Sequence, residues 1–164
     1  MLIQEFDVMD TAEASDLVRS CADVPGWVGA VVAGRPYDDA QHLFARAAEL
    51  AATWTELDVA RALADHPRIG ERHAGSGESA AMSAREQSGV DPTDADVQER
   101  LAEGNRAYEE RFDRIFLIRA AGRSASEVLA QLEARLANDP VTELQVTAQQ
   151  LREIADLRLR GLFT

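Results

Sequence analysis

The last third of the chain contains a predicted helix with one charged residue on its apolar side. At about 100° per residue, Leu151, Ile154 and Ala155 fall on one face, and Arg158 falls in the middle of it. An unpaired charge in a core is strongly destabilising, so this guanidinium needs a partner. Two interpretations stay open: a salt bridge to a carboxylate of the protein, or a clamp on an anionic substrate, which the planar Arg fork suits.

His66 is the histidine with the clearest structural context. The helix predicted from Thr55 ends near Asp65, because Pro67 keeps His66 out of the helical region. The end of a helix favours a protonated imidazole, which suits a proton donor near neutral pH. A structural role is still the more common one for a lone histidine. The sequence has no His-x-x-x-His spacing and no paired cysteines, so we expect no metal site.

The stretch Ser83-Ala84-Arg85-Glu86-Gln87 places a hydroxyl, an acid and an amide within five positions. Ser-x-x-Glu is a capping box, so we expect a short helix to begin here. The cap explains Ser83 and Glu86 without any substrate, but it does not explain Gln87. A helix N-terminus with these groups also binds polar ligands well, and the motif alone does not decide between the two roles.

Composition limits the classes of partner. With 164 residues, 46% of them hydrophobic, we expect one domain covering 1–164. The formal charge of -12 argues against nucleic acid and anionic membranes as partners, so an anionic ligand needs a local cationic pocket. No apolar run approaches the roughly 20 residues of a membrane span. The N-terminal residues do not resemble a secretory signal, and we expect a cytoplasmic protein.

Capping patterns predict where helices begin, because a capping residue is followed three positions later by an acid or amide. They place helix starts at Asp10, Thr55, Ser83, Thr93, Ser124 and Thr142. A further helix is expected from about Asp38 to Trp54. The pattern predicts an all-α fold, a single compact domain of about eight helices.

Three other segments lack a predicted helix start. Residues 27–33 form a short apolar segment, and residues 70–82 contain three glycines and no apolar period, which predicts an exposed, mobile loop. Such loops often close over sites. Residues 115–118 are the only uninterrupted run of bulky apolar residues; the run is too short to identify as a helix and is compatible with a buried extended segment.

Five blocks of the sequence together resemble the 2-oxo-4-hydroxy-4-carboxy-5-ureidoimidazoline (OHCU) decarboxylase family. They agree in order and spacing over nearly the whole chain, although one common form of the first block has Asp where this chain has Arg68. The blocks are His66-Pro67-Arg68-Ile69-Gly70, Ser83-Ala84-Arg85-Glu86-Gln87-Ser88-Gly89, Asn105-x-x-Tyr108 leading to Phe112, Gly122-Arg123-Ser124, and Leu157-Arg158-Leu159. The resemblance implies an all-helical, commonly dimeric enzyme that converts OHCU to (S)-allantoin in urate degradation.

The resemblance also implies roles for individual residues. His66 is expected to be the catalytic proton donor and Glu86 its acidic partner. The expected substrate-binding residues are Pro67, Ser83, Ala84, Arg85, Gln87 and Arg158, together with Phe116, Leu117, Ile118, Arg119 and Ala120, a segment whose main chain contacts the ligand.

The chemistry of this substrate needs no cofactor. Its carboxylate is attached to a carbon next to a C=N bond, so the electrons released with CO₂ move onto nitrogen without pyridoxal, thiamine or metal. Two rival functions stay open: a decarboxylase of a related ureido or imidazoline acid, and an acidic helical interaction module whose Arg158 pairs internally.

Overall fold

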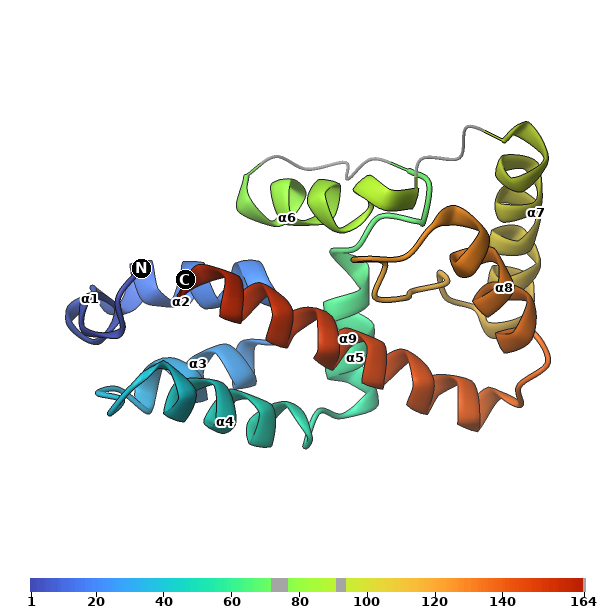
Figure 1. Cartoon of the computed structure of the whole chain (residues 1–164). Helices are drawn as coiled ribbons and strands as arrows, with labels where there is room; N and C mark the ends of the chain where they lie inside the picture. The colour runs from blue at the N-terminus through green and yellow to red at the C-terminus, as the bar shows by residue number, and fades with distance from the viewer. Residues whose placement is uncertain (72–76, 91–93, 164) are drawn as a thin grey trace. The chain divides into compact units, whose positions relative to one another are not determined.

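The computed structural model describes residues 1–71, 77–90 and 94–163. These described residues form nine α-helices and one short 3-10 helix and contain no strand, which confirms the predicted all-α fold (Figure 1). The chain forms two compact units, one made of Met1–Asp65 with Leu151–Thr164 and one made of His66–Gln150. No helix among the described residues is long and apolar enough to cross a membrane.

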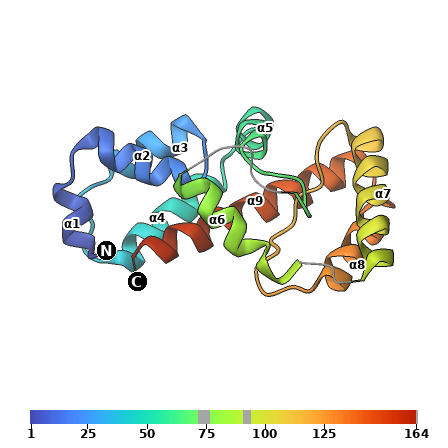
Figure 2. The ribbon, with the colours of Figure 1, turned by 90° about the horizontal axis from the view of Figure 1, so that it is seen from above.

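The first unit contains the N-terminal helices and the second half of the last helix. Its elements are α1 (Ile3–Val8), α2 (Thr11–Cys21), α3 (Pro25–Ala33), α4 (Ala40–Ala51), α5 (Glu56–Ala64) and the C-terminal part of α9 (Pro140–Leu162). Helix α3 packs against both α2 and α4, and Figure 2 shows α2 running beside α3. The Trp27 indole donates a 2.9 Å hydrogen bond to the Ala47 carbonyl, which joins α3 to α4 inside the core.

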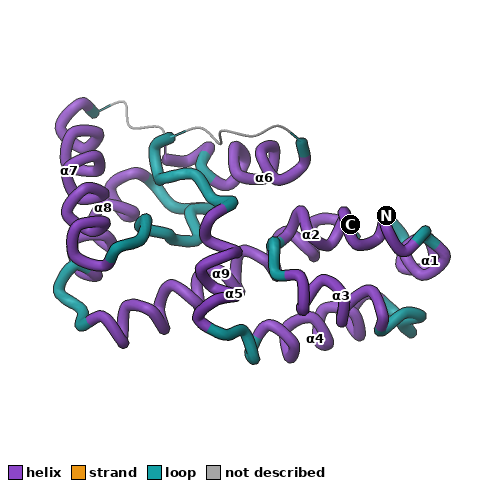
Figure 3. Tube along the Cα trace, turned by 180° about the vertical axis from the view of Figure 1, so that it is seen from behind, coloured by secondary structure: helices purple, strands orange, loops and turns teal. Residues whose placement is uncertain are grey.

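The second unit contains α6 (Glu78–Glu86), η1 (Ser88–Val90), α7 (Ala95–Phe112), α8 (Ala125–Arg135) and the first part of α9. Helices α7 and α8 pack side by side (Figure 1). Leu101, Tyr108 and Phe112 of α7 are buried in one core cluster, and Val97 packs against it. The chain between α7 and α8 is drawn as a loop in Figure 3 and includes residues 115–120. Most of these residues are buried, in agreement with the expected buried segment.

Several predicted helix starts are confirmed in detail. Asp10 caps α2, and complete capping boxes join Thr55 to Asp58 at α5 and Ser124 to Glu127 at α8. In each case the cap forms between residues close in sequence, so the local pattern is sufficient.

Other predicted starts are wrong. Helix α6 begins at Glu78, five residues before Ser83, so the proposed capping box of Ser83 and Glu86 does not exist: Ser83 is buried within the helix, and Glu86 ends it. The last helix begins at Pro140 rather than Thr142, because the Asp139 side chain accepts the N–H groups of the first turn. Proline suits this first position because it lacks the N–H that would need a partner.

Two segments expected outside helices are partly or wholly helical. Residues 27–33 belong to α3, which begins at Pro25. Of the predicted loop 70–82, residues 78–82 are helical, and residues 72–76 lie outside the described part. Ala and Met are good helix formers even without an apolar period, which explains why this helix was missed. The helix expected at Thr93 begins at Ala95 with Asp94 as its cap, while Thr93 itself lies outside the described residues.

Candidate functional site

His66 lies directly after the end of α5, as predicted from Pro67. The helix ends at Ala64 with Asp65 as its C-cap, and the half-buried His66 then leads into the chain of the second unit. Its Nε2 atom is buried. The helix therefore ends before His66, as the position of Pro67 indicated.

The segment that follows His66 is tied to α6 and α7 by two amide side chains. The Gly70 N–H donates to the Gln87 side-chain oxygen at 2.9 Å, and the Gln87 amide nitrogen donates to the Arg68 carbonyl at 3.4 Å. From α7, the Asn105 amide donates to the Ile69 carbonyl at 3.1 Å. Three of the five sequence blocks therefore meet at residues 68–70, which are bonded to Gln87 and to Asn105. Gln87, expected to bind substrate, here binds the loop that carries His66.

A cavity of about 1060 Å³ lies in the second unit between this loop, α6 and α7. Four of the predicted substrate-binding residues line it: Pro67, Ser83, Ala84 and Gln87. His66, Arg85, Glu86 and residues 116–120 are not among its lining residues, and Arg158 belongs to the first unit. Asn105, only 7% exposed, also lines the cavity, and its side-chain oxygen has no hydrogen-bond partner among the described residues.

Arg68, the position where this chain departs from one common family pattern, forms an ion pair at the cavity wall. Its guanidinium makes a two-pronged contact with the Glu109 carboxylate, with one of the two distances 3.0 Å. The hydrogen bond from Arg68 lowers the pKa of Glu109, and the same pairing raises the pKa of the guanidinium. Arg68 therefore contributes to the loop's attachment to α7.

Each of the second and fourth sequence blocks contains a glycine that the local backbone geometry requires. A Cβ on Gly89 would lie 2.8 Å from the Arg123 carbonyl oxygen, so only glycine permits this close approach of two backbones. Gly122 has a φ of +78°, which other residues rarely adopt. The geometry brings the end of the α6 region against the loop before α8.

The main chain of residues 116–120 is partly occupied by side chains from two helices. The Leu117 carbonyl accepts a 2.6 Å hydrogen bond from Arg135, and the Arg119 N–H donates a 2.9 Å hydrogen bond to Gln150. The Ala120 carbonyl accepts from the Arg123 N–H. Among the described residues, no hydrogen bond reaches either backbone group of Phe116 or Ile118.

Arg158 lies in the first unit and is buried, with 4% of its surface exposed. Its neighbours Leu151, Ile154 and Ala155 are buried as well, so the apolar face predicted from helical period is confirmed. The guanidinium donates a 3.4 Å hydrogen bond to the Ser20 carbonyl of α2.

The family profile of OHCU decarboxylase matches residues 7–160 of the chain. The chain belongs to the OHCU decarboxylase family. A family member from Amia calva, named 2-oxo-4-hydroxy-4-carboxy-5-ureidoimidazoline decarboxylase, is 30% identical over 149 residues, covering 90% of this chain and 83% of its own. A crystal structure of an OHCU decarboxylase in the presence of (S)-allantoin superposes with a TM-score of 0.75 at 26% identity, covering 90% of this chain and 97% of that one.

The uric acid degradation bifunctional protein TTL of Arabidopsis thaliana is 37% identical over 110 residues, which cover 65% of this chain. The aligned region spans only 34% of that longer relative.

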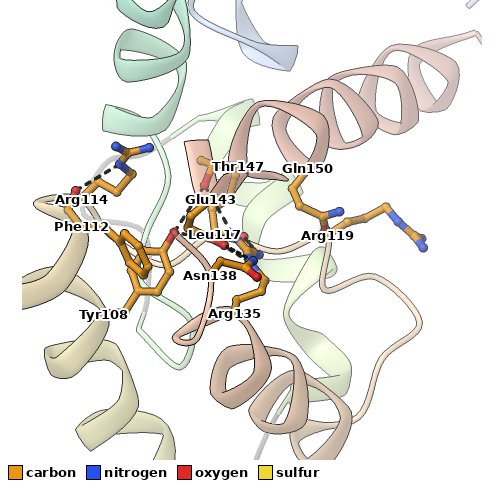
Figure 4. Close-up of polar contacts among 10 residues, drawn as sticks. All are labelled: Tyr108, Phe112, Arg114, Leu117, Arg119, Arg135, Asn138, Glu143, Thr147 and Gln150. Atoms are coloured by element: carbon orange, nitrogen blue, oxygen red, sulfur yellow. Dashed lines mark hydrogen bonds and ion pairs between the residues drawn. The ribbon is translucent and has the colours of Figure 1, made fainter. Parts of the chain in front are cut away.

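This OHCU decarboxylase family member also has a buried polar cluster that was not predicted from the sequence. Glu143 is fully buried and contacts Tyr108, Arg135 and Asn138 (Figure 4). The same helical period that identified Arg158 places Glu143 and Thr147 on the buried face of α9. The helical period of the sequence therefore does indicate that Glu143 is buried.

Proposed function

We propose that this chain is a carboxy-lyase that decarboxylates OHCU to (S)-allantoin in urate degradation. Family membership over residues 7–160 supports the reaction. The structural observation that carries the proposal is the bond between the Gly70 N–H and the Gln87 side chain, which joins the loop carrying His66 to the end of the helix that carries Glu86.

The proposed mechanism needs only binding, orientation and one proton transfer. Loss of CO₂ is easiest when the carboxylate stands out of the plane of the adjacent C=N bond, because the released electron pair then moves onto nitrogen. Arg158 would hold an anionic group of the substrate in a buried position. His66 would then deliver a proton to one face of the reacting carbon, with Glu86 orienting the imidazole or accepting the substrate hydroxyl.

Main-chain groups would supply the remaining contacts. The N–H and C=O of Ile118 lie in a buried segment and have no hydrogen bond among the described residues. A ureido group carries both donors and acceptors, so these main-chain groups are suited to it. We also propose a homodimer in the cytoplasm with neither nucleic acid nor membrane as partner; the net charge of -12 supports the last two points.

The decisive experiment uses OHCU generated freshly from urate. Purified protein is expected to speed the loss of OHCU, followed by absorbance, and to yield one hand of allantoin, followed by circular dichroism. A spontaneous rate with racemic allantoin would contradict the function. Loss of a related imidazoline acid in place of OHCU would point to the rival decarboxylase.

A further inference from the structure

The main-chain segment expected to contact substrate is held by side chains for which no role has been assigned so far. Arg135 at the end of α8 donates its 2.6 Å hydrogen bond to the Leu117 carbonyl, and Gln150 on α9 accepts at 2.9 Å from the Arg119 N–H (Figure 4). The two anchored residues are therefore two positions apart, with Ile118 between them.

Spacing by two has a geometric consequence in a non-helical segment. In an extended chain, the polar main-chain groups of successive residues point to opposite edges. Residues 115–120 form no helix; where such a segment is extended, anchoring residues 117 and 119 along one edge leaves the groups of Ile118 on the other edge. The observed hydrogen bonds agree with this alternation, because Leu117 and Arg119 are bonded while neither backbone group of Ile118 is bonded among the described residues.

Arg135 is itself held in place by its surroundings. It is 6% exposed, and its Nε donates a 2.8 Å hydrogen bond to the fully buried Glu143. The guanidinium carbon lies 4.7 Å from the centre of the Phe116 ring. Glu143 in turn accepts a hydrogen bond from Asn138 at 2.9 Å. Because Glu143 and the Phe116 ring fix the guanidinium, the N–H at Nη1 of Arg135 is held in the direction of the Leu117 carbonyl.

We propose that Arg135 and Gln150 are positioning residues of the decarboxylase: they hold residues 117 and 119 by their main chain and so fix the shape of the segment 116–120, to which the proposed function assigns contacts with the substrate. The inference rests on the proposed function. Neither side chain touches the reacting atoms in this scheme. Both act through the segment, in which a displacement of about 1 Å costs on the order of 100-fold in rate.

The test compares Gln150→Leu with Gln145→Leu, a matched control on the same helix. Gln145 is exposed, and its side chain has no hydrogen bond among the described residues. Gln150→Leu is expected to lower kcat/KM for OHCU by on the order of 10- to 100-fold and to reduce the enantiomeric excess of allantoin. Its thermal midpoint is expected to stay close to that of wild type. Gln145→Leu should keep wild-type rates.

Amide hydrogen exchange provides a readout that does not depend on catalysis. The Arg119 amide is expected to be protected in wild type and to exchange faster in Gln150→Leu, but not in Gln145→Leu. Equal exchange in all three proteins overturns the positioning role, whether or not the wild type decarboxylates OHCU. Failure of the wild type to act on OHCU overturns the proposed function instead.

Arg135→Lys provides a second variant that keeps the buried charge beside Glu143. A lysine has no planar fork and cannot serve both Glu143 and Leu117 with the same geometry. We expect a raised KM with kcat less affected, together with faster exchange across residues 116–120. Wild-type KM and stereoselectivity in both Arg135→Lys and Gln150→Leu would overturn the proposal.

Discussion

The phenolic hydroxyl of Tyr108 on α7 donates a 2.6 Å hydrogen bond to the carboxylate of Glu143 on α9, and the two residues are 35 positions apart in sequence. Tyr108 is fully buried, and burial followed by the bond to Glu143 raises its pKa to about 12. The hydroxyl therefore stays protonated and remains a donor throughout the physiological range. This contact ties the motif residue Tyr108 to the cluster that holds residues 116–120.

Removing this hydroxyl is expected to destabilise the fold more than removing a comparable one elsewhere. Tyr108→Phe should lower the free energy of unfolding by about 1.5–3 kcal/mol, because the acceptor is charged. Tyr37→Phe is the matched control: Tyr37 is also buried, but its hydroxyl donates to a neutral acceptor, the Val31 carbonyl, at 2.7 Å. That loss should be about 0.5–1.5 kcal/mol. Urea unfolding measures both; equal losses would contradict a charged Glu143.

Variants of the buried pair of Arg135 and Glu143 are expected to change the free energy of unfolding and the KM for OHCU to different extents. Glu143→Leu leaves the Arg135 charge without this carboxylate and should cost about 3–5 kcal/mol. The double variant Arg135→Met/Glu143→Leu should recover part of that loss, since neither charge remains, while the Tyr108 hydroxyl still lacks its Glu143 acceptor. It should not recover wild-type KM, because the contact with Leu117 is still missing. Urea unfolding and OHCU kinetics on the same preparations test this; recovery of both quantities would contradict the positioning role.

The features predicted correctly from the sequence depend on neighbours in the chain. The end of α5 before His66 follows from the geometry of Pro67, and the cap at Thr55 forms with Asp58 three residues away. Arg158 was identified because helical period is itself a local property. Ser83 shows where this reasoning fails: its sequence matches a capping box, but a helix that begins earlier includes it.

The contacts that define the candidate site join residues far apart in sequence. Gln87 binds a loop 17 residues away, and Arg135 binds Leu117 at a distance of 18 residues. Neither partner is indicated by local spacing, because an amide or guanidinium can bind any backbone group that the fold brings near it. Only tertiary packing selects the partner, which is why these roles emerged from the structure.

Acidification should weaken α5 through its capping box. The Asp58 carboxylate accepts hydrogen bonds from the Thr55 N–H and hydroxyl, and these bonds lower its pKa from 3.8. Its stabilising contribution is therefore present above about pH 4 and is lost as the pH falls through the lowered pKa. The gap in thermal midpoint between wild type and Asp58→Ala should be widest near neutral pH and narrow toward about pH 3. Glu56→Ala, in the same helical turn, is the control; a gap that does not change with pH would contradict the cap's role.

Arg158 is expected to matter more for substrate than for the fold. Arg158→Leu should raise KM for OHCU while leaving the thermal midpoint unchanged or higher, because the residue lies on an apolar, buried face. Arg160→Leu is the control, since Arg160 is exposed on the same helix and pairs with Asp156 at 2.7 Å. Marked unfolding of Arg158→Leu would favour a structural role, in which the guanidinium holds α2 through Ser20.

His66 is expected to be required for catalysis and dispensable for folding. It follows the end of α5 rather than lying within a helix, so His66→Ala should leave the far-ultraviolet circular dichroism unchanged. Loss of a general acid costs about 10²- to 10⁴-fold in rate, so OHCU turnover should fall to near the spontaneous rate and the allantoin should become racemic. Glu86→Gln keeps a hydrogen-bonding side chain and should lose less. His42→Ala is the control, because His42 lies exposed on α4 beside Asp38. Wild-type turnover in His66→Ala would show that another group donates the proton and that His66 has a structural role.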